Sequence, residues 1–315
     1  MTRLASKRKL WFTISLLVII PGLISLIFSG LKPGIDFTGG TLWELRFSQP
    51  ATAVEIESAL RAAGVESVIV QRSGPATDET FLIRMPEVTE GSTRKTELAQ
   101  ALETSVGPFT EREYATVGGA LSTQIRNRAI LAVALASVGI LLYMAYAFRN
   151  TQRPLLYGSS ALVAMLHDVL IVLGVFSILG LLFNVQIDAL FITALLTVIG
   201  FSVHDTIVVF DRIRENLAKH PDESFEAIVD YSLAQTVVRS LNTSLTVIFT
   251  LLALVLFGGG STRLFVLALL IGIVSGTYSS IFNASQLLVA WENGEIQRFF
   301  RRFTRARTEP ALPAA

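Results

Sequence analysis

The sequence lacks cysteine altogether, and only three of its 315 residues are histidine. Disulfides, iron–sulfur clusters and thiolate zinc sites are therefore excluded. His167, His204 and His220 are too few and too scattered to form a metal cage, so we expect neither a metal nor a cofactor. The sequence also has no G-x-x-x-x-G-K-[ST] phosphate-binding loop, which argues against an ATP-driven motor within the chain. We expect no enzymatic activity.

Charge is scarce as well, whereas apolar residues are abundant. Charged residues make up 16% of the chain, hydrophobic residues make up 51%, and the mean hydropathy is +0.56. An ordinary soluble domain is less apolar than this, and the net charge of +1 does not suggest a nucleic-acid partner. A membrane-spanning helix needs about 20 apolar residues. Six windows meet that requirement, near residues 10–30, 128–148, 155–180, 188–210, 238–258 and 263–290.

The first window follows a basic stretch, as a secretory signal would. It is nearer in length to a membrane span than to a signal sequence, and no small-residue cleavage pattern follows it. We therefore expect an uncleaved first span.

The arginine and lysine residues predict the orientation of the spans. With six spans, the basic groups next to them all fall on one side, and the positive-inside rule identifies that side as cytoplasmic. Both termini are then cytoplasmic, and residues 31–126 lie outside. These basic residues are Arg3, Lys7, Arg8 and Lys9; Arg149 and Arg153; Arg212, Arg214 and Lys219; and Arg298, Arg301, Arg302, Arg305 and Arg307.

Four regions follow from this reading. They are residues 1–30, the cytoplasmic N-terminus and first span; 31–126, an external domain; 127–290, five further spans; and 291–315, a basic cytoplasmic tail. In the external segment, apolar alternation and helical spacing predict strands at 41–47, 67–71, 80–85 and 110–117 and helices at 53–63 and 93–106.

The order of these elements, βαββαβ, is that of a ferredoxin-like α+β domain. The predicted fold is thus an α-helical, polytopic membrane protein with a ferredoxin-like domain between its first two spans. A fold of this kind names no activity by itself.

Two ionisable residues stand out near the cytoplasmic ends of the spans. Charged residues inside a membrane cost about 2.5 to 3.5 kcal/mol on insertion scales, so each is a candidate for function. Asp205 lies seven residues before Arg212, roughly 10 Å inside the helix end. Arg239 begins the next window at the same side, so an Asp205–Arg239 pair that separates and rejoins can load and release a proton. The alternatives are an ion pair that only fixes helix packing and an Arg239 side chain that extends to the interface.

Other polar and small residues in the spans are possible supports for this pair. His204 faces about 100° around the helix from Asp205, which favours a packing or hydrogen-bonding role. Asp168 either helps a proton path or caps an internal network. Gly272 and Gly276 form a small-xxx-small pattern that permits close helix approach. The remaining polar candidates are Thr206, Asn242, Thr243 and Ser244.

Four blocks of the sequence together resemble the signature blocks of the SecF family, within the resistance-nodulation-division superfamily. The first follows the first span and contains Gly34, Asp36, Gly39 and Gly40. The others are His204 to Asn216, Leu241 to Leu245 and Gly276 to Phe282. His204 stands where asparagine is usual in that family.

The resemblance implies a bacterial inner-membrane subunit that forms a heterodimer with SecD. It implies that the proton gradient drives late preprotein export through SecYEG, with SecA and YajC as functional partners. Asp205 and Arg239 then match the residues associated with proton conduction, and the external domain engages the preprotein. Two alternatives stay open: a proton-coupled exporter subunit for lipids or drugs, and a non-conducting scaffold of the translocon.

Overall fold

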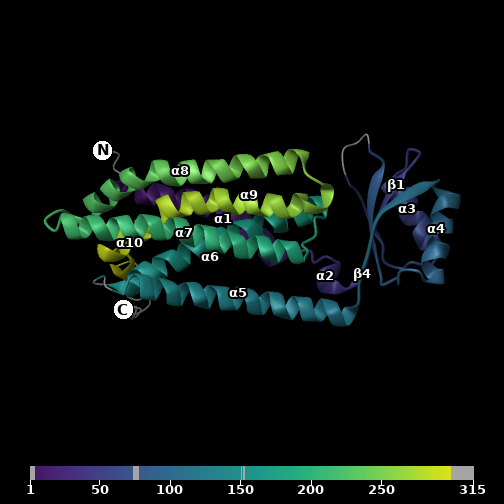
Figure 1. Ribbon diagram of the computed structural model, residues 1–315, viewed down its shortest axis with the longest axis horizontal. Helices are drawn as coiled ribbons and strands as arrows, with labels where there is room; N and C mark the ends of the chain where they lie inside the picture. Colours follow the sequence, from purple (N-terminus) through teal and green to yellow (C-terminus); the bar gives the residue numbers. More distant parts are fainter. Residues whose placement is uncertain (1–3, 74–77, 150, 152, 299–315) are drawn as a thin grey trace, which may run out of the picture.

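The computed structural model describes residues 4–73, 78–149, 151 and 153–298 as a bundle of long helices with a small sheet domain at one end (Figure 1). Six helices in these residues are long and apolar enough to cross a membrane, which confirms the predicted number of spans. Five of them are α1 (Arg8–Phe28), α5 (Gly119–Ala147), α6 (Pro154–Phe183), α7 (Ala189–Lys219) and α8 (Phe225–Phe257). The sixth consists of α9 (Gly260–Ser279), a π-helical turn (Ser280–Ala284) and α10 (Ser285–Glu292), and a short 3-10 turn, Ala5–Lys7, precedes α1.

Several helices extend beyond the predicted apolar windows. Helix α7 continues to Lys219, and α8 begins at Phe225 rather than near residue 238. The hydropathy windows end where charged residues begin, whereas the helix itself continues through them. Intrahelical ion pairs support this polar part of α7, such as that between Arg214 and Asp211 at 2.6 Å.

The external segment contains the predicted order of elements, βαββαβ. The elements are β1 (Gly40–Phe47), α3 (Ala53–Ala62), β2 (Ile69–Arg72), β3 (Thr80–Met85), α4 (Thr93–Ser105) and β4 (Phe109–Val117). The strands form one antiparallel sheet in the order β2-β3-β1-β4, so β1 is central. The ferredoxin-like fold itself stays a prediction that this strand order supports. Residues 74–77, between β2 and β3, lie outside the described residues.

Helices α3 and α4 cover the face of the sheet that is turned away from the bundle (Figure 1). Alternate residues of the strands supply the core between them, as period-two alternation predicts. Trp43, Leu45 and Ile83 from the strands and Leu60 and Leu98 from the helices are almost completely buried there.

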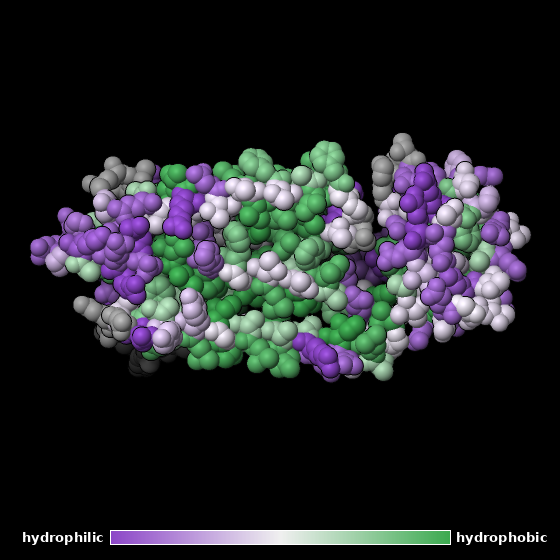
Figure 2. All heavy atoms as spheres, viewed as in Figure 1, coloured by the Kyte–Doolittle hydropathy of each residue, from purple (hydrophilic) through white to green (hydrophobic). Residues whose placement is uncertain are grey.

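The bundle carries a hydrophobic band along its side, with hydrophilic residues on the sheet domain and at the far end (Figure 2). At that far end, Arg8 of α1 pairs with Glu226 of α8 at 3.1 Å and with Glu295 after α10. These pairs tie the start of the first span to the end of the last. Arg3 and the predicted basic tail beyond Arg298 lie outside the described residues.

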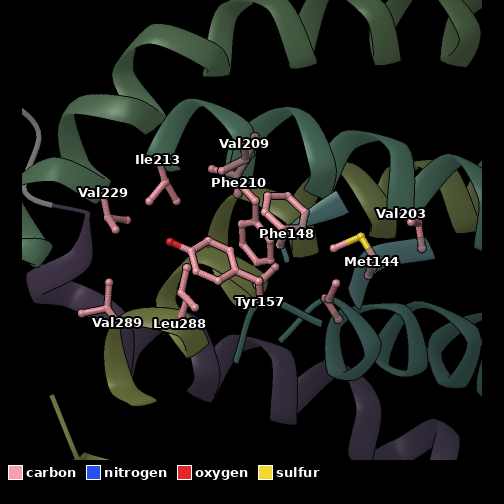
Figure 3. Close-up of a cluster of buried hydrophobic side chains, with 14 of the residues drawn as sticks. Met144, Phe148, Tyr157, Val203, Val209, Phe210, Ile213, Val229, Leu288 and Val289 are labelled. Carbon is pink, nitrogen blue, oxygen red and sulfur yellow. The ribbon is translucent and has the colours of Figure 1, made fainter. Parts of the chain in front are cut away.

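A cluster of aromatic rings fills the bundle near the same end (Figure 3). Tyr157 stacks on Phe148 at 5.1 Å between ring centroids, and both rings meet the edge or face of Phe210. Leu288 and Val289 of α10 join this cluster, so the last helix closes the core where α5, α6 and α7 meet.

Helices α1 and α6 cross at two glycines. A Cβ on Gly174 would lie 2.7 Å from the Cα of Gly22, and a Cβ on Gly22 would lie 2.8 Å from the Cα of Gly174. One turn further, Ser25 and Ser177 share a hydrogen bond of 2.8 Å. Small residues let membrane helices approach closely enough for such contacts.

Replacing Gly174 by alanine therefore places a methyl group against a backbone that cannot move aside. We expect Gly174→Ala to lower the free energy of unfolding by about 1 to 3 kcal/mol through overpacking. The matched control is Gly139→Ala in α5, where a Cβ would have no atom within 4 Å. That change should stabilise the helix by up to about 1 kcal/mol. Unfolding in detergent, followed by circular dichroism, compares the two, and equal stability would contradict the close crossing.

Candidate functional site

Asp205 lies near the middle of α7 and is only 8% exposed. Its Oδ1 accepts a hydrogen bond from the Ser240 hydroxyl of α8 at 2.8 Å. Its Oδ2 is buried and has no hydrogen-bond partner among the described residues. The carboxylate thus keeps one acceptor oxygen unoccupied at a depth where polar groups are normally satisfied.

No ion pair joins Asp205 and Arg239 in the described part of the chain. The neighbouring residue, Ser240, contacts Asp205 instead, and the Arg239 side chain is exposed. Successive residues on a helix point about 100° apart, so α8 cannot direct both side chains at the same carboxylate. The two helices lie side by side as expected, and the contact to Asp205 comes from Ser240.

A row of polar side chains lies beside Asp205 on the outer surface of α7 and α8. His204, Arg239, Asn242 and Thr243 are all exposed, next to apolar residues such as Leu241. The exposure of His204 and the burial of Asp205 agree with the predicted 100° between them. A polar surface within an apolar helix bundle is costly in lipid, so it marks a surface that interacts with something other than acyl chains.

Asp168 of α6 is a second buried carboxylate, and it is 0% exposed. Its Oδ2 accepts hydrogen bonds from the hydroxyls of Ser202 and Ser279, each at 2.6 Å. Its Oδ1 accepts from Ser275 at 2.6 Å and lies 3.0 Å from Nδ1 of His167. This one side chain therefore connects α6 to α7 and α9. Unlike Asp205, it has both oxygens fully occupied.

Two glycines of α9 bring that helix close enough to α7 for these contacts. A Cβ on Gly272 would lie 2.1 Å from Cγ2 of Val198, and a Cβ on Gly276 would lie 3.3 Å from Cβ of Ser202. Two more hydrogen bonds join α9 and the π-helical turn after it to α7 and α8. Thr206 shares a hydrogen bond of 3.0 Å with Ser280, and Ser244 accepts one of 2.7 Å from Thr277.

The glycine-rich signature after α1 lies at the end of the bundle that faces the sheet. Gly34 precedes a short helix, α2 (Ile35–Thr38), and Gly39 and Gly40 lead from it into β1. Asp36 of α2 contacts the start of α7. The structure thus separates the predicted residues into three places along the bundle: Asp205 with its polar surface, Asp168 with its serines, and the glycine-rich segment.

The hydroxyl partners of the two carboxylates were not predicted. Ser240, Ser275 and Ser279 are small polar residues in largely apolar helices, and such residues occur in many membrane helices. The four-residue spacing of Ser275 and Ser279 places them on one face of α9, and that spacing was the available signal. Nothing in the sequence shows that Asp168, more than a hundred residues earlier, lies opposite that face.

The fold and the site together define a class: multi-pass membrane proteins with a small domain after the first span and carboxylates held between the later spans. Two family models match the chain. "Protein export membrane protein SecD/SecF, C-terminal" matches residues 97–294, and "SecD/SecF GG Motif" matches residues 24–51. The chain belongs to the SecD/SecF family.

Similar proteins from other organisms carry the same assignment. The protein translocase subunit SecF of Thermobaculum terrenum is 55% identical, over 98% of both chains. That of Anaerolinea thermophila is 42% identical, over 96% of this chain and 98% of the relative. The crystal structure of SecDF, a translocon-associated membrane protein from Thermus thermophilus, superposes with a TM-score of 0.80 at 33% identity. It matches 92% of this chain, which spans only 38% of the SecDF chain.

The network around Asp168 predicts which buried serines matter for stability. Ser275→Ala or Ser279→Ala removes one hydrogen bond to the carboxylate and should cost about 1 kcal/mol each, a usual value in membrane proteins. The control is Ser160→Ala: this α6 hydroxyl is also fully buried, yet it has no partner among the described residues. Its loss should cost nothing measurable. Detergent unfolding of the three variants tests this, and equal losses at Ser160 and Ser279 would argue against the network.

Proposed function

We propose that this chain acts as the SecF-type subunit of a protein translocase, in which proton movement across the bacterial inner membrane promotes preprotein translocation. Membership in the SecD/SecF family supports this assignment. The chain itself is a transport subunit rather than an enzyme. A protein named SecF matches 98% of this chain, and 92% of the chain superposes on 38% of a SecDF chain, which supports a SecD part as its partner.

The single observation that carries the proton step is the unoccupied Oδ2 of Asp205. A carboxylate that binds and releases protons needs an oxygen free to accept one, and Asp205 has it. Asp168 has four hydrogen-bond contacts to its two oxygens and is suited to holding helices together. Asp205 is therefore the proton carrier, and Asp168 is a structural centre.

The exposed polar row on α7 and α8 is the surface that SecD covers. His204 and Arg239 flank the proton carrier on this surface, and both are exposed in the described part of the chain. A second set of membrane helices here removes an arginine from lipid and closes the proton path between the two subunits. Arg239 then keeps a place in the path through contacts at the interface, in place of the intrachain ion pair expected from the sequence.

The remaining partners belong to the same proposal. SecYEG provides the channel, SecA and YajC act in the same process, and the external domain engages the preprotein. A lipid or drug exporter is less well supported, because the relatives that match the whole chain are translocase subunits. An exporter would be further excluded if this chain copurified with SecD and SecY.

The proton step is tested by Asp205→Asn in proteoliposomes that contain SecYEG, SecA, SecD and this chain. Asparagine preserves the size and the contact to Ser240 but does not carry a proton, so gradient-dependent stimulation of translocation should be lost while the complex still assembles. Asp211→Asn, an exposed carboxylate on the same helix, is the control and should retain full stimulation. Persistent stimulation in Asp205→Asn would favour the non-conducting scaffold.

The orientation proposed for the chain places the sheet domain outside and both termini in the cytoplasm. Because the sequence has no cysteine, single cysteines report accessibility without background. Glu103→Cys on α4 should react with a membrane-impermeant maleimide added to the outside of spheroplasts. Asp222→Cys in the turn between α7 and α8 should react only in inverted vesicles. Reversed labelling would invert the topology.

A further inference from the structure

The glycine-rich segment after α1 is bonded directly to the start of α7. The amide of Gly34 donates to the carbonyl of Ile187 at 2.7 Å, and the amide of Ile187 donates to the carbonyl of Lys32 at 2.9 Å. The amide of Ala189, the first residue of α7, donates to Oδ2 of Asp36 at 2.7 Å. We call residues 32–40 together with 187–189 the clasp.

The other end of the clasp is built into the sheet. Gly39 and Gly40 have φ of +77° and +124°, which side chains rarely adopt. A Cβ on Gly40 would lie 2.7 Å from the carbonyl oxygen of Met85, at the end of β3. Gly40 is also the first residue of β1, the central strand. The glycine-rich segment therefore leads directly into β1, with no flexible linker between α2 and the sheet.

Apolar packing fixes the middle of the clasp. Phe37 of α2 is buried in the cluster that contains Phe176 of α6 and Phe191 of α7. Figure 1 shows α2 between the helix bundle and the sheet. Phe37 and Asp36 thus anchor α2 on the bundle. Gly39 and Gly40, which follow α2, connect it to the sheet.

Charged groups surround the contact at the start of α7. Asp188 accepts a hydrogen bond from the amide of Phe191 at 2.9 Å, and burial together with the nearby Asp36 raises the pKa of Asp188. On the sheet side, burial lowers the pKa of Arg84, and the charge of Asp188 opposes that shift. Arg84 also donates to Gln71, which in turn donates to the carbonyl of Asn184 at 2.7 Å. These hydrogen bonds form a second, polar contact between the sheet and the loop before α7.

We propose that Asp36 is a positioning residue that couples movement of α7 to movement of the external domain. This inference rests on the proposed function, because it takes Asp205 as the place where proton binding acts. Helix α7 runs without interruption from Ala189 to Asp205, about 24 Å at 1.5 Å per residue. A displacement of α7 at Asp205 reaches Ala189, passes through Asp36 to α2, and moves β1 through the two glycines.

The test measures proton conduction separately from the stimulation of translocation by the proton gradient. Proteoliposomes with SecYEG, SecA, SecD and this chain are assayed for gradient-driven proton flux and for gradient-dependent translocation. In Asp36→Ala we expect the flux to stay at the wild-type level and the stimulation of translocation to be lost. Asp36→Asn keeps an acceptor oxygen for Ala189 and should restore most of the stimulation. Glu103→Ala removes an exposed carboxylate from α4, away from the clasp, and should change neither readout.

Each other outcome has a defined meaning. If Asp36→Ala keeps both flux and stimulation, the coupling role is wrong. If it loses both although the complex assembles, Asp36 serves only the integrity of the membrane helices, and the proposal is likewise overturned. Asp205→Asn in the same vesicles tests the proposed function separately: retained stimulation there refutes proton carriage by Asp205, whatever the Asp36 variants show.

Discussion

The bundle depends on one constraint, that a polar group in the membrane must find its partner within the protein. Asp168 shows how this is met. Three serine hydroxyls from α7 and α9 and one histidine surround its two oxygens, and glycines in α9 remove the side chains that would hold the helices apart. Without hydrophobic force to drive helices together in lipid, such hydrogen bonds and close contacts fix their arrangement. The position of α7, and with it the position of Asp205, follows from this network.

The two intramembrane carboxylates differ in how completely their oxygens are hydrogen-bonded, and the proposed function rests on that difference. Asp168 is enclosed by donors from three helices, so losing its acceptor oxygens would leave several hydroxyls without partners. Within the described residues, Asp205 has one donor, one unoccupied oxygen, and an exposed polar surface beside it. Stability and proton exchange place opposite demands on a buried acid. In the proposed function, these demands fall on two residues of neighbouring helices.

The sequence predicted the large elements well, because their signals are local and strong. Six apolar windows, the alternation in the strands and the helical spacing of residues 53–63 gave the spans and the order βαββαβ. It predicted the site less completely. Asp205 and Asp168 could be found because charges are rare inside spans. Ser240 could not be chosen over Arg239, because neighbouring residues differ only in the direction they face, and rotation of α8 about its axis is set by tertiary packing.

The clasp also bears on how the chain is assembled during synthesis. All four strands of the sheet lie between Gly40 and Val117, so the external domain has its complete set of strands before α6 and α7 are made. The partners of Gly34 and Asp36, Ile187 and Ala189, come about 150 residues later in the chain. The bonds of Gly34 and Asp36 to residues 187–189 form only after the fourth span is made, which makes the clasp a late step of biogenesis.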